Sequence, residues 1–188
     1  MMNSNSMFTI LEDATPTTSA TTTLEFQSTW HMYLLKLGEA AQSPSVDHVC
    51  DIHTVADFWN LFNHLDFYAL DREPSVWVFV RGARSPIWTA EENKLGGCWS
   101  MLIPKRAGVE VFQDIAMSLI GESVAEIDKF TSFSIAAKRG VFNIKLFTDN
   151  CEHTKKLGEA KNVFPSDMAM WKHLGQCSEI RYTPNASR

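Results

Sequence analysis

Short runs in which apolar and polar residues alternate recur along most of the chain, and glycine, proline or small polar residues separate them. Runs of about four to eight residues that are rich in aromatic and β-branched side chains are typical of strands. The fifth and sixth runs are separated only by Lys138, Arg139 and Gly140, which indicates a hairpin with a basic turn. The predicted strands are residues 30–37, 48–53, 75–81, 97–103, 130–137, 141–148 and 179–183.

Other segments carry apolar residues at helical spacing. In the first of them, Thr54 is expected at the N-cap, with Asp57 three residues later, where the acid of a capping box lies. Trp59 lies at the edge of the apolar face of this helix, so it is either a large lid over the core or an exposed anchor for a partner. Gly121 is placed to end the second helix. The predicted helices are residues 54–65, 109–121 and 152–164.

These elements predict an α+β fold, in which helices pack on one side of a mainly antiparallel sheet. Residues 1–25 are rich in threonine and serine and offer little apolar surface, so we expect a disordered tail. Residues 26–188 are expected to form one domain.

Composition and charge narrow the range of functions. The chain has 188 residues and a formal net charge of −5, which argues against a broad duplex-binding surface but leaves room for a small basic pocket. No run approaches the roughly 20 apolar residues of a membrane span, and no secretory signal is evident. The four cysteines are scattered, which favours reduced thiols in a cytosolic or nuclear protein.

Catalytic and metal chemistry find little support in the sequence. Cys50 and Cys151 each have an acid and a histidine within three residues, but nothing holds a base within reach of either thiol, so we do not expect an enzyme. The histidines at 31, 48, 53 and 64 lack the spacing of metal ligands, and no glycine loop connects a strand to a helix. We therefore expect neither a metal nor a cofactor.

Residues 85–99 are too polar and rich in turn residues to form a strand, although they contain Trp88. The tryptophan either folds back onto the core or presents a π face to a ligand. Glu91 and Glu92 follow it, and the Lys138–Arg139 turn offers positive charge. A positively charged purine with trailing phosphates would suit this combination of aromatic, acidic and basic side chains.

Several of these segments resemble the translation initiation factor 4E family, which binds the cap of messenger RNA. Residues 54–65 resemble the first helix of that family, and residues 86–99 resemble its tryptophan loop, with eleven residues from Trp88 to Trp99. Residues 118–123 resemble the end of its second long helix, and Trp30 with the following strand matches its first strand. The resemblance covers residues 30–147.

The resemblance implies a curved antiparallel sheet with three helices on its convex face and a slot for 7-methylguanosine on the concave face. Trp88 matches one of two tryptophans that sandwich the cap, and Phe147 matches a tryptophan near the methyl group. Thr89 replaces the acid that reads guanine, so Glu91 or Glu92 would have to reach the base. The implied cap-binding residues are Trp88, Thr89, Glu91, Glu92, Lys138, Arg139, Asn143 and Phe147.

Further departures concern the phosphates and the second face of the slot. Cys98 stands where the family has an arginine, and Asn143 stands where it has a lysine. Lys138 or Arg139 falls at a basic position that contacts the phosphates. The loop at 38–47, which should carry the second sandwiching tryptophan near Gln42 or Ser43, contains no aromatic residue.

On the helical face, the resemblance implies a groove for a 4G-like scaffold factor or a 4E-binding protein, with Trp59 as an exposed anchor. The implied partner-binding residues are Val55, Trp59, Met117, Ile120 and Gly121. The sequence thus predicts a monomeric, cap-binding translation initiation factor of the cytoplasm, or also the nucleus, with no membrane partner. The alternatives are an interaction module or translation regulator with weak or lost cap binding and an enzyme that uses Cys50 or Cys151.

Overall fold

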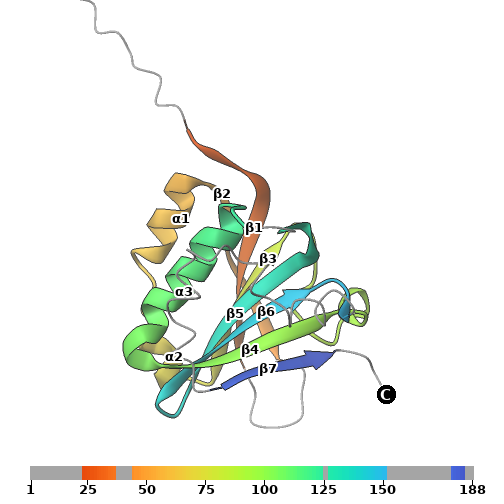
Figure 1. The fold of residues 1–188 in the computed structure, drawn as a ribbon. Helices are drawn as coiled ribbons and strands as arrows, with labels where there is room; N and C mark the ends of the chain where they lie inside the picture. Colours follow the sequence, from red (N-terminus) through yellow and green to blue (C-terminus); the bar gives the residue numbers. More distant parts are fainter. Residues whose placement is uncertain (1–22, 37–43, 125–126, 152–178, 185–188) are drawn as a thin grey trace, which may run out of the picture.

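A single antiparallel sheet of seven strands, ordered β2-β1-β3-β5-β6-β4-β7, forms the body of the protein (Figure 1). The structure, a computed structural model, describes residues 23–36, 44–124, 127–151 and 179–184. The strands are β1 (Glu25–Lys36), β2 (Ser45–Thr54), β3 (Ser75–Arg81), β4 (Gly97–Pro104), β5 (Phe130–Lys138), β6 (Val141–Thr148) and β7 (Glu179–Pro184). All seven predicted strands are present, and the predicted mainly antiparallel α+β fold is confirmed.

The helices lie on one face of this sheet (Figure 1). In the described residues they are α1 (Val55–Phe62), α2 (Ala69–Arg72) and α3 (Lys105–Ile120), with two short 3-10 turns, η1 (Glu91–Asn93) and η2 (Ile127–Lys129). The helix predicted at 152–164 lies outside the described residues. The short α2 was not predicted, because its segment reads as a polar connection.

Aromatic side chains fill the core between the helices and the sheet. Phe79 of β3 and Phe133 of β5 stack face to face, with ring centroids 4.7 Å apart and an interplanar angle of 6°. Phe112 of α3 contacts both rings, at 5.7 and 5.6 Å, and all three side chains are fully buried. Each such pair adds about 0.5–1.5 kcal/mol beyond the burial of its area, so this trio fixes α3 against the middle of the sheet.

The start of α1 agrees with the predicted capping box. Oγ1 of Thr54 accepts a hydrogen bond from the backbone N–H of Asp57 at 3.1 Å, and Oδ2 of Asp57 accepts one from the backbone N–H of Thr54 at 2.9 Å. These two bonds satisfy donors that the first turn of a helix leaves unpaired. The helix ends at Phe62, three residues before the predicted end.

Helix α3 begins at Lys105, directly after Pro104 and four residues earlier than predicted. Gly108, a poor helix former, hides this first turn from the sequence pattern. The structure shows why a glycine is needed: a Cβ at this position would lie 2.4 Å from Cδ2 of Phe142 on β6. The missing side chain lets the helix backbone approach the sheet closely.

Strand β1 begins at Glu25, five residues before the predicted strand and one residue before the expected start of the domain. Its first residues run beside the start of α1, where the backbone N–H of Val55 donates to the carbonyl oxygen of Leu24 at 2.9 Å. The side chains of residues 25–29 are mostly polar, which explains why the pattern did not indicate a strand there.

The second face of the sheet, opposite the helices, carries the alternate side chains. Leu35, Val78 and Val80 form a small apolar cluster on it. Towards β6 the same face becomes polar, with Ser134 and Asn143. We call this the concave face, and it matters because residues from distant parts of the sequence meet on it.

Candidate functional site

Trp88 and Phe147 form the aromatic centre of the candidate site. Trp88 lies in the loop between β3 and β4, and its ring centroid is 4.9 Å from that of Phe147, at an interplanar angle of 52°. Successive side chains of β6 point to opposite faces of the sheet. The neighbours of Phe147, Leu146 and Thr148, are buried, and Leu146 belongs to the core, so Phe147 points to the concave face. A shallow hollow lies beside the two rings. It is lined by Ser85, Pro86, Trp88, Asn93, Thr131, Ser132, Phe147 and Thr148.

The loop that carries Trp88 is held by its own hydrogen bonds. Nδ2 of Asn93 donates to the carbonyl oxygens of Ser85 at 3.1 Å and of Ile87 at 2.8 Å. At the far end of the loop, a Cβ at Gly96 would lie 2.3 Å from the carbonyl oxygen of Thr148, so only glycine allows this close approach to β6. Residues 85–96 therefore have a defined shape around the tryptophan.

The two predicted base-reading acids take part in the structure of the loop. Oε1 of Glu92 accepts a hydrogen bond from the backbone N–H of Ser85 at 2.5 Å, and Glu91 forms an ion pair with Lys94. Thr89 is exposed. None of these three residues lines the hollow, so a carboxylate would have to leave its present partner to reach a base stacked on Trp88.

The predicted phosphate-binding residues lie towards the hairpin that joins β5 to β6. Lys138 and Arg139 are exposed at the β5–β6 hairpin, where Gly140 adopts a φ of +79° in the turn. At about 3.4 Å per residue, this hairpin is roughly 20 Å from Phe147. Asn143 is only 7% exposed, and its Oδ1 accepts a hydrogen bond from Oγ of Ser100 at 2.9 Å.

Lys145 is a cation that the sequence analysis did not single out. It lies two residues before Phe147 on the same face of β6, opposite Ser134 of β5 and Ser100 of β4. Burial raises the pKa of the Cys98 thiol, and the positive charge of Lys145 partly opposes this rise. The signal was present in the alternation along β6, which places Asn143, Lys145 and Phe147 on one face.

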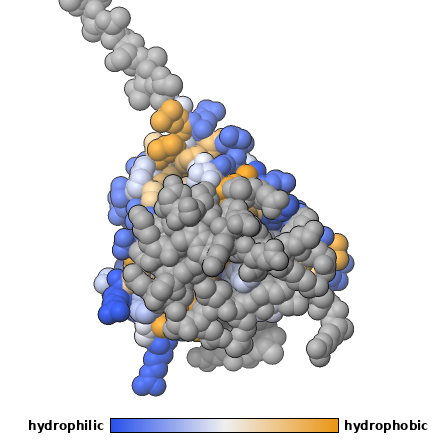
Figure 2. Space-filling view, in the orientation of Figure 1, coloured by the Kyte–Doolittle hydropathy of each residue, from blue (hydrophilic) through white to orange (hydrophobic). Residues whose placement is uncertain are grey.

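A second candidate site is a groove on the helical side. It is lined by Phe26, Val55, Phe58, Trp59, Met117 and Gly121. We call these six residues the dorsal groove. Figure 2 shows hydrophobic surface where β1 begins beside α1. Trp59 is 38% exposed and Met117 is 37% exposed, so both can touch a partner.

Ile120 is fully buried in the core. Its side chain packs in the core and does not face the surface. This corrects the expectation that Ile120 lies along the groove. The other four residues that were predicted for partner binding all line the dorsal groove.

The thiol of Cys50 has an environment that does not favour a nucleophile. Burial, and after it the negative charges of Asp51 and Asp57, raises the pKa of Cys50, which keeps the thiol protonated at neutral pH. Cys50 pairs with Met32 in the sheet and packs against the core. The backbone N–H of Cys151 donates to the carbonyl oxygen of Leu95 at 2.7 Å.

Within the part of the chain that the structure describes, the helices are too short or too polar to cross a membrane.

Comparison with known proteins identifies a family. The family described as eukaryotic initiation factor 4E matches residues 25–185. Among curated proteins, eukaryotic translation initiation factor 4E of Dictyostelium discoideum is 22% identical over 160 residues, which cover 84% of this chain and 62% of that protein. The human factor of the same name is 22% identical over 150 residues, which cover 77% of this chain and 69% of that protein.

Solved structures of similar fold include a C. elegans eIF4E-3 in complex with the 4E-binding protein Mextli and a cap analog. It has a TM-score of 0.69 and 19% identity, and the match covers 87% of this chain and 93% of that chain. A Schistosome eIF4E complexed with m7GpppG and 4E-BP has a TM-score of 0.70 and 16% identity, and the match covers 87% of this chain and 89% of that chain.

Proposed function

The chain belongs to the eukaryotic initiation factor 4E family, and from this premise we propose that it binds the 7-methylguanosine cap of messenger RNA on the concave face. We also propose that a 4G-like scaffold factor or a 4E-binding protein occupies the dorsal groove. The similar solved structures that contain cap analogues and 4E-binding proteins support both parts of this proposal.

The observation that carries the cap proposal is the pairing of Trp88 with Phe147 beside a hollow. Methylation at N7 gives the guanine ring a positive charge, and such a ring gains about 2 kcal/mol over a desolvated tryptophan face. In this arrangement the base stacks on Trp88, and Phe147 lies at the edge that carries the methyl group.

The phosphates would follow the concave face of β6. Lys145 lies about 7 Å from Phe147 along the strand, within reach of the first phosphates. Lys138 and Arg139 at the hairpin would contact the more distant part of the RNA, where they are exposed and free to change rotamer. The proposal therefore places Lys145 before the hairpin residues along the path of the phosphates.

Selectivity for guanine should be low. Thr89 has no carboxylate, and Glu91 and Glu92 are engaged with Lys94 and the backbone of Ser85. Purine N–H groups that lose water and find no acceptor cost about 1–3 kcal/mol. We infer that binding depends on stacking and charge, with little contribution from the edge of the base.

The dorsal groove suits an apolar helix from a partner. Trp59 and Met117 come from different helices, α1 and α3, and both are partly exposed. Helices that dock in a groove of this kind insert apolar anchors spaced at i, i+3 and i+4. Recognition in both sites requires no chemical step, and we propose that the domain acts as a monomer in the cytoplasm, where initiation takes place.

A second candidate function is an interaction module that holds a 4G-like partner with little cap binding. The specific observation in its favour is the contrast between the two sites. The dorsal groove is open and lined by apolar residues, whereas no acid lines the hollow beside Trp88. Such a protein would regulate initiation by occupying the scaffold.

One experiment separates the two functions. Tryptophan fluorescence is followed while 7-methyl-GTP is added, with unmethylated GTP as the matched control ligand. Quenching by the methylated nucleotide at concentrations where GTP has no effect supports the cap proposal. A peptide with tyrosine and leucine anchors is titrated in parallel. Peptide binding without any response to 7-methyl-GTP supports the interaction module.

A further inference from the structure

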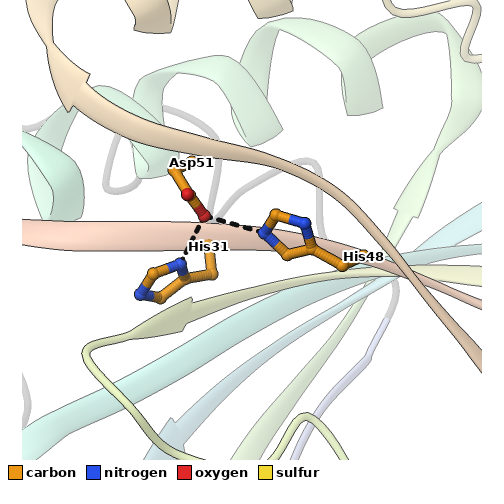
Figure 3. Close-up of side chains that lie close together, drawn as sticks. All are labelled: His31, His48 and Asp51. Atoms are coloured by element: carbon orange, nitrogen blue, oxygen red, sulfur yellow. Dashed lines mark hydrogen bonds and ion pairs between the residues drawn. The ribbon is translucent and has the colours of Figure 1, made fainter.

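His31, His48 and Asp51 converge on one point of the concave face. Nδ1 of His31 lies 2.6 Å from Oδ1 of Asp51, and Nε2 of His48 lies 2.7 Å from the same oxygen. Figure 3 shows both imidazole rings turned towards this carboxylate. The three possible ligand atoms all lie within 4.8 Å of one another. We call these three residues the histidine cluster.

The pairing of β1 with β2 explains why these residues meet. His31 pairs directly with Asp51, and the side chains of such a pair point to the same face. His48 and Asp51 are three residues apart on β2, so regular alternation would place them on opposite faces. A bulge changes this: Met32 pairs with Cys50 while the next residue, Tyr33, pairs with His48, so the extra residue Val49 restores His48 to the face of Asp51.

We propose that the histidine cluster binds a divalent transition-metal ion, with Zn²⁺ as the best match. Two imidazole nitrogens and one carboxylate oxygen are ligands that zinc accepts, and three protein ligands leave a fourth position for water. The linear spacing of the histidines gave no sign of this site, because one ligand comes from a neighbouring strand and another depends on the bulge.

The geometry needs only small adjustments to accept an ion. A tetrahedral zinc site with bonds of about 2.0–2.1 Å holds its ligand atoms about 3.4 Å apart. The imidazole–carboxylate distances of 2.6 and 2.7 Å would open, and the two rings would move closer together. The side chains of His48 and Asp51 are 46% and 43% exposed, so their χ angles can rotate and an ion can enter from solvent.

Neighbouring residues give the cluster partial support. The ring of Tyr33 packs edge to face against His48, with centroids 5.3 Å apart. A bound ion would connect the edge strand β2 to β1 through side chains, in addition to the backbone ladder. The cluster is separated from Phe147 by β3 and β5, roughly 14 Å across the sheet, so this proposal stands independently of the cap proposal.

The test is a Zn²⁺ titration of the full chain in competition with a chromophoric chelator, under reducing conditions. The variants are His31→Asn, His48→Asn and Asp51→Asn. His53→Asn is the matched control, because His53 is an exposed histidine of the same strand whose Nδ1 lies near Oγ1 of Thr29 and outside the cluster. We expect one Zn²⁺ per parent chain and a loss of affinity of at least about tenfold in each cluster variant.

Two further readouts exclude a purely structural explanation. Zn²⁺ should raise the melting temperature of the parent and of the His53→Asn variant, but not that of the cluster variants. Co²⁺ bound to the parent should show d–d absorption without a thiolate charge-transfer band, which excludes binding by cysteines. If Asp51→Asn does not fold, the two histidine variants carry the test.

The outcomes that overturn the proposal are equally defined. They are a parent chain that takes no Zn²⁺ from the chelator, binding that persists in either histidine variant, or a Co²⁺ spectrum dominated by thiolate ligands. In each of these cases the histidine cluster is a hydrogen-bonded contact between two strands.

Discussion

Phe58 and Trp59 are neighbours on α1 whose rings meet edge to face, with centroids 5.1 Å apart and an interplanar angle of 85°. Their environments differ sharply, since Phe58 is 3% exposed and Trp59 is 38% exposed. Both rings line the dorsal groove, but Phe58 is buried in the core beneath it and Trp59 is partly exposed at its surface. This difference makes the pair a matched test of the groove.

We expect Trp59→Ala to abolish binding of a 4G-type peptide while the fold survives. The exposed ring contributes little to the core, so the free energy of unfolding should fall by about 1 kcal/mol. Phe58→Ala removes a buried ring and should cost about 3–5 kcal/mol. Peptide titration and urea unfolding of both variants check this. Equal losses of stability in the two variants would place Trp59 in the core and contradict the groove.

Trp88→Ala should weaken binding of 7-methyl-GTP by about ten- to a hundredfold, because stacking of one base on an aromatic ring is worth about 1–3 kcal/mol. Trp88→Phe keeps a π face and should retain part of the affinity. Since the first variant removes one source of fluorescence, calorimetry is the better measurement. Unchanged affinity in Trp88→Ala would show that the base does not stack in this hollow.

Lys145→Met should weaken binding of 7-methyl-GTP more than binding of 7-methylguanosine, which has no phosphates. The loss should be about tenfold at low salt, since a hydrogen bond to a charged group contributes about 1.5–3 kcal/mol, and it should shrink as salt screens the charge. Arg106→Met, an exposed position at the start of α3, serves as the control. A similar loss for nucleotide and nucleoside would show that Lys145 does not contact phosphate.

Thr54→Ala should lower the free energy of unfolding by about 1 kcal/mol, the usual cost of removing a helix N-cap. Oγ1 of Thr54 would no longer accept the hydrogen bond from the backbone of Asp57. Chemical denaturation at neutral pH measures this cost. No change in stability would show that the first turn of α1 forms without its cap.

The acid half of the same capping box predicts a pH dependence. Burial raises the pKa of the Asp57 carboxyl, but hydrogen bonds from Thr54 and from the backbone of His53, with the charge of His53, outweigh this and hold it below its ordinary value. Because the native state binds the proton less tightly than the unfolded chain, Asp57 stabilises the fold above about pH 4 and loses this effect as the pH falls further.

Asp57→Asn should therefore reduce the loss of stability on acidification below about pH 4, while lowering stability at neutral pH. Urea unfolding of parent and variant across this range measures the difference. Parallel pH profiles for the two proteins would contradict the role of the carboxylate.

The sequence was sufficient wherever a side-chain pattern determines the element. Alternation located every strand among the residues that the structure describes, and Thr54 with Asp57 located the start of α1. It failed at the first turn of α3, because Gly108 is chosen for its contact with Phe142 and not for its helix propensity. Pairing between strands also cannot be read from local pattern, which is why Glu25 was assigned to the tail and residues 26–29 were not predicted as part of a strand.

The same distinction between local pattern and strand pairing applies to the candidate sites. Trp88, Phe147 and Trp59 could be found because they belong to recognisable local motifs. The histidine cluster could not, since its members meet only through the register of β1 and β2 and through one bulge. Lys145 was visible in the alternation of β6, which places it on the same face as Phe147. The prediction named the basic residues of the hairpin turn instead.

The hydrogen bonds within residues 85–96 have a consequence for the kinetics and thermodynamics of recognition. Asn93, Glu92 and the close approach of Gly96 to Thr148 order this segment when the chain folds. A ligand therefore meets Trp88 already in position, and association does not carry the entropy loss of arranging a flexible loop. Gly96→Ala would transfer that loss from folding to binding, with slower association as the sign.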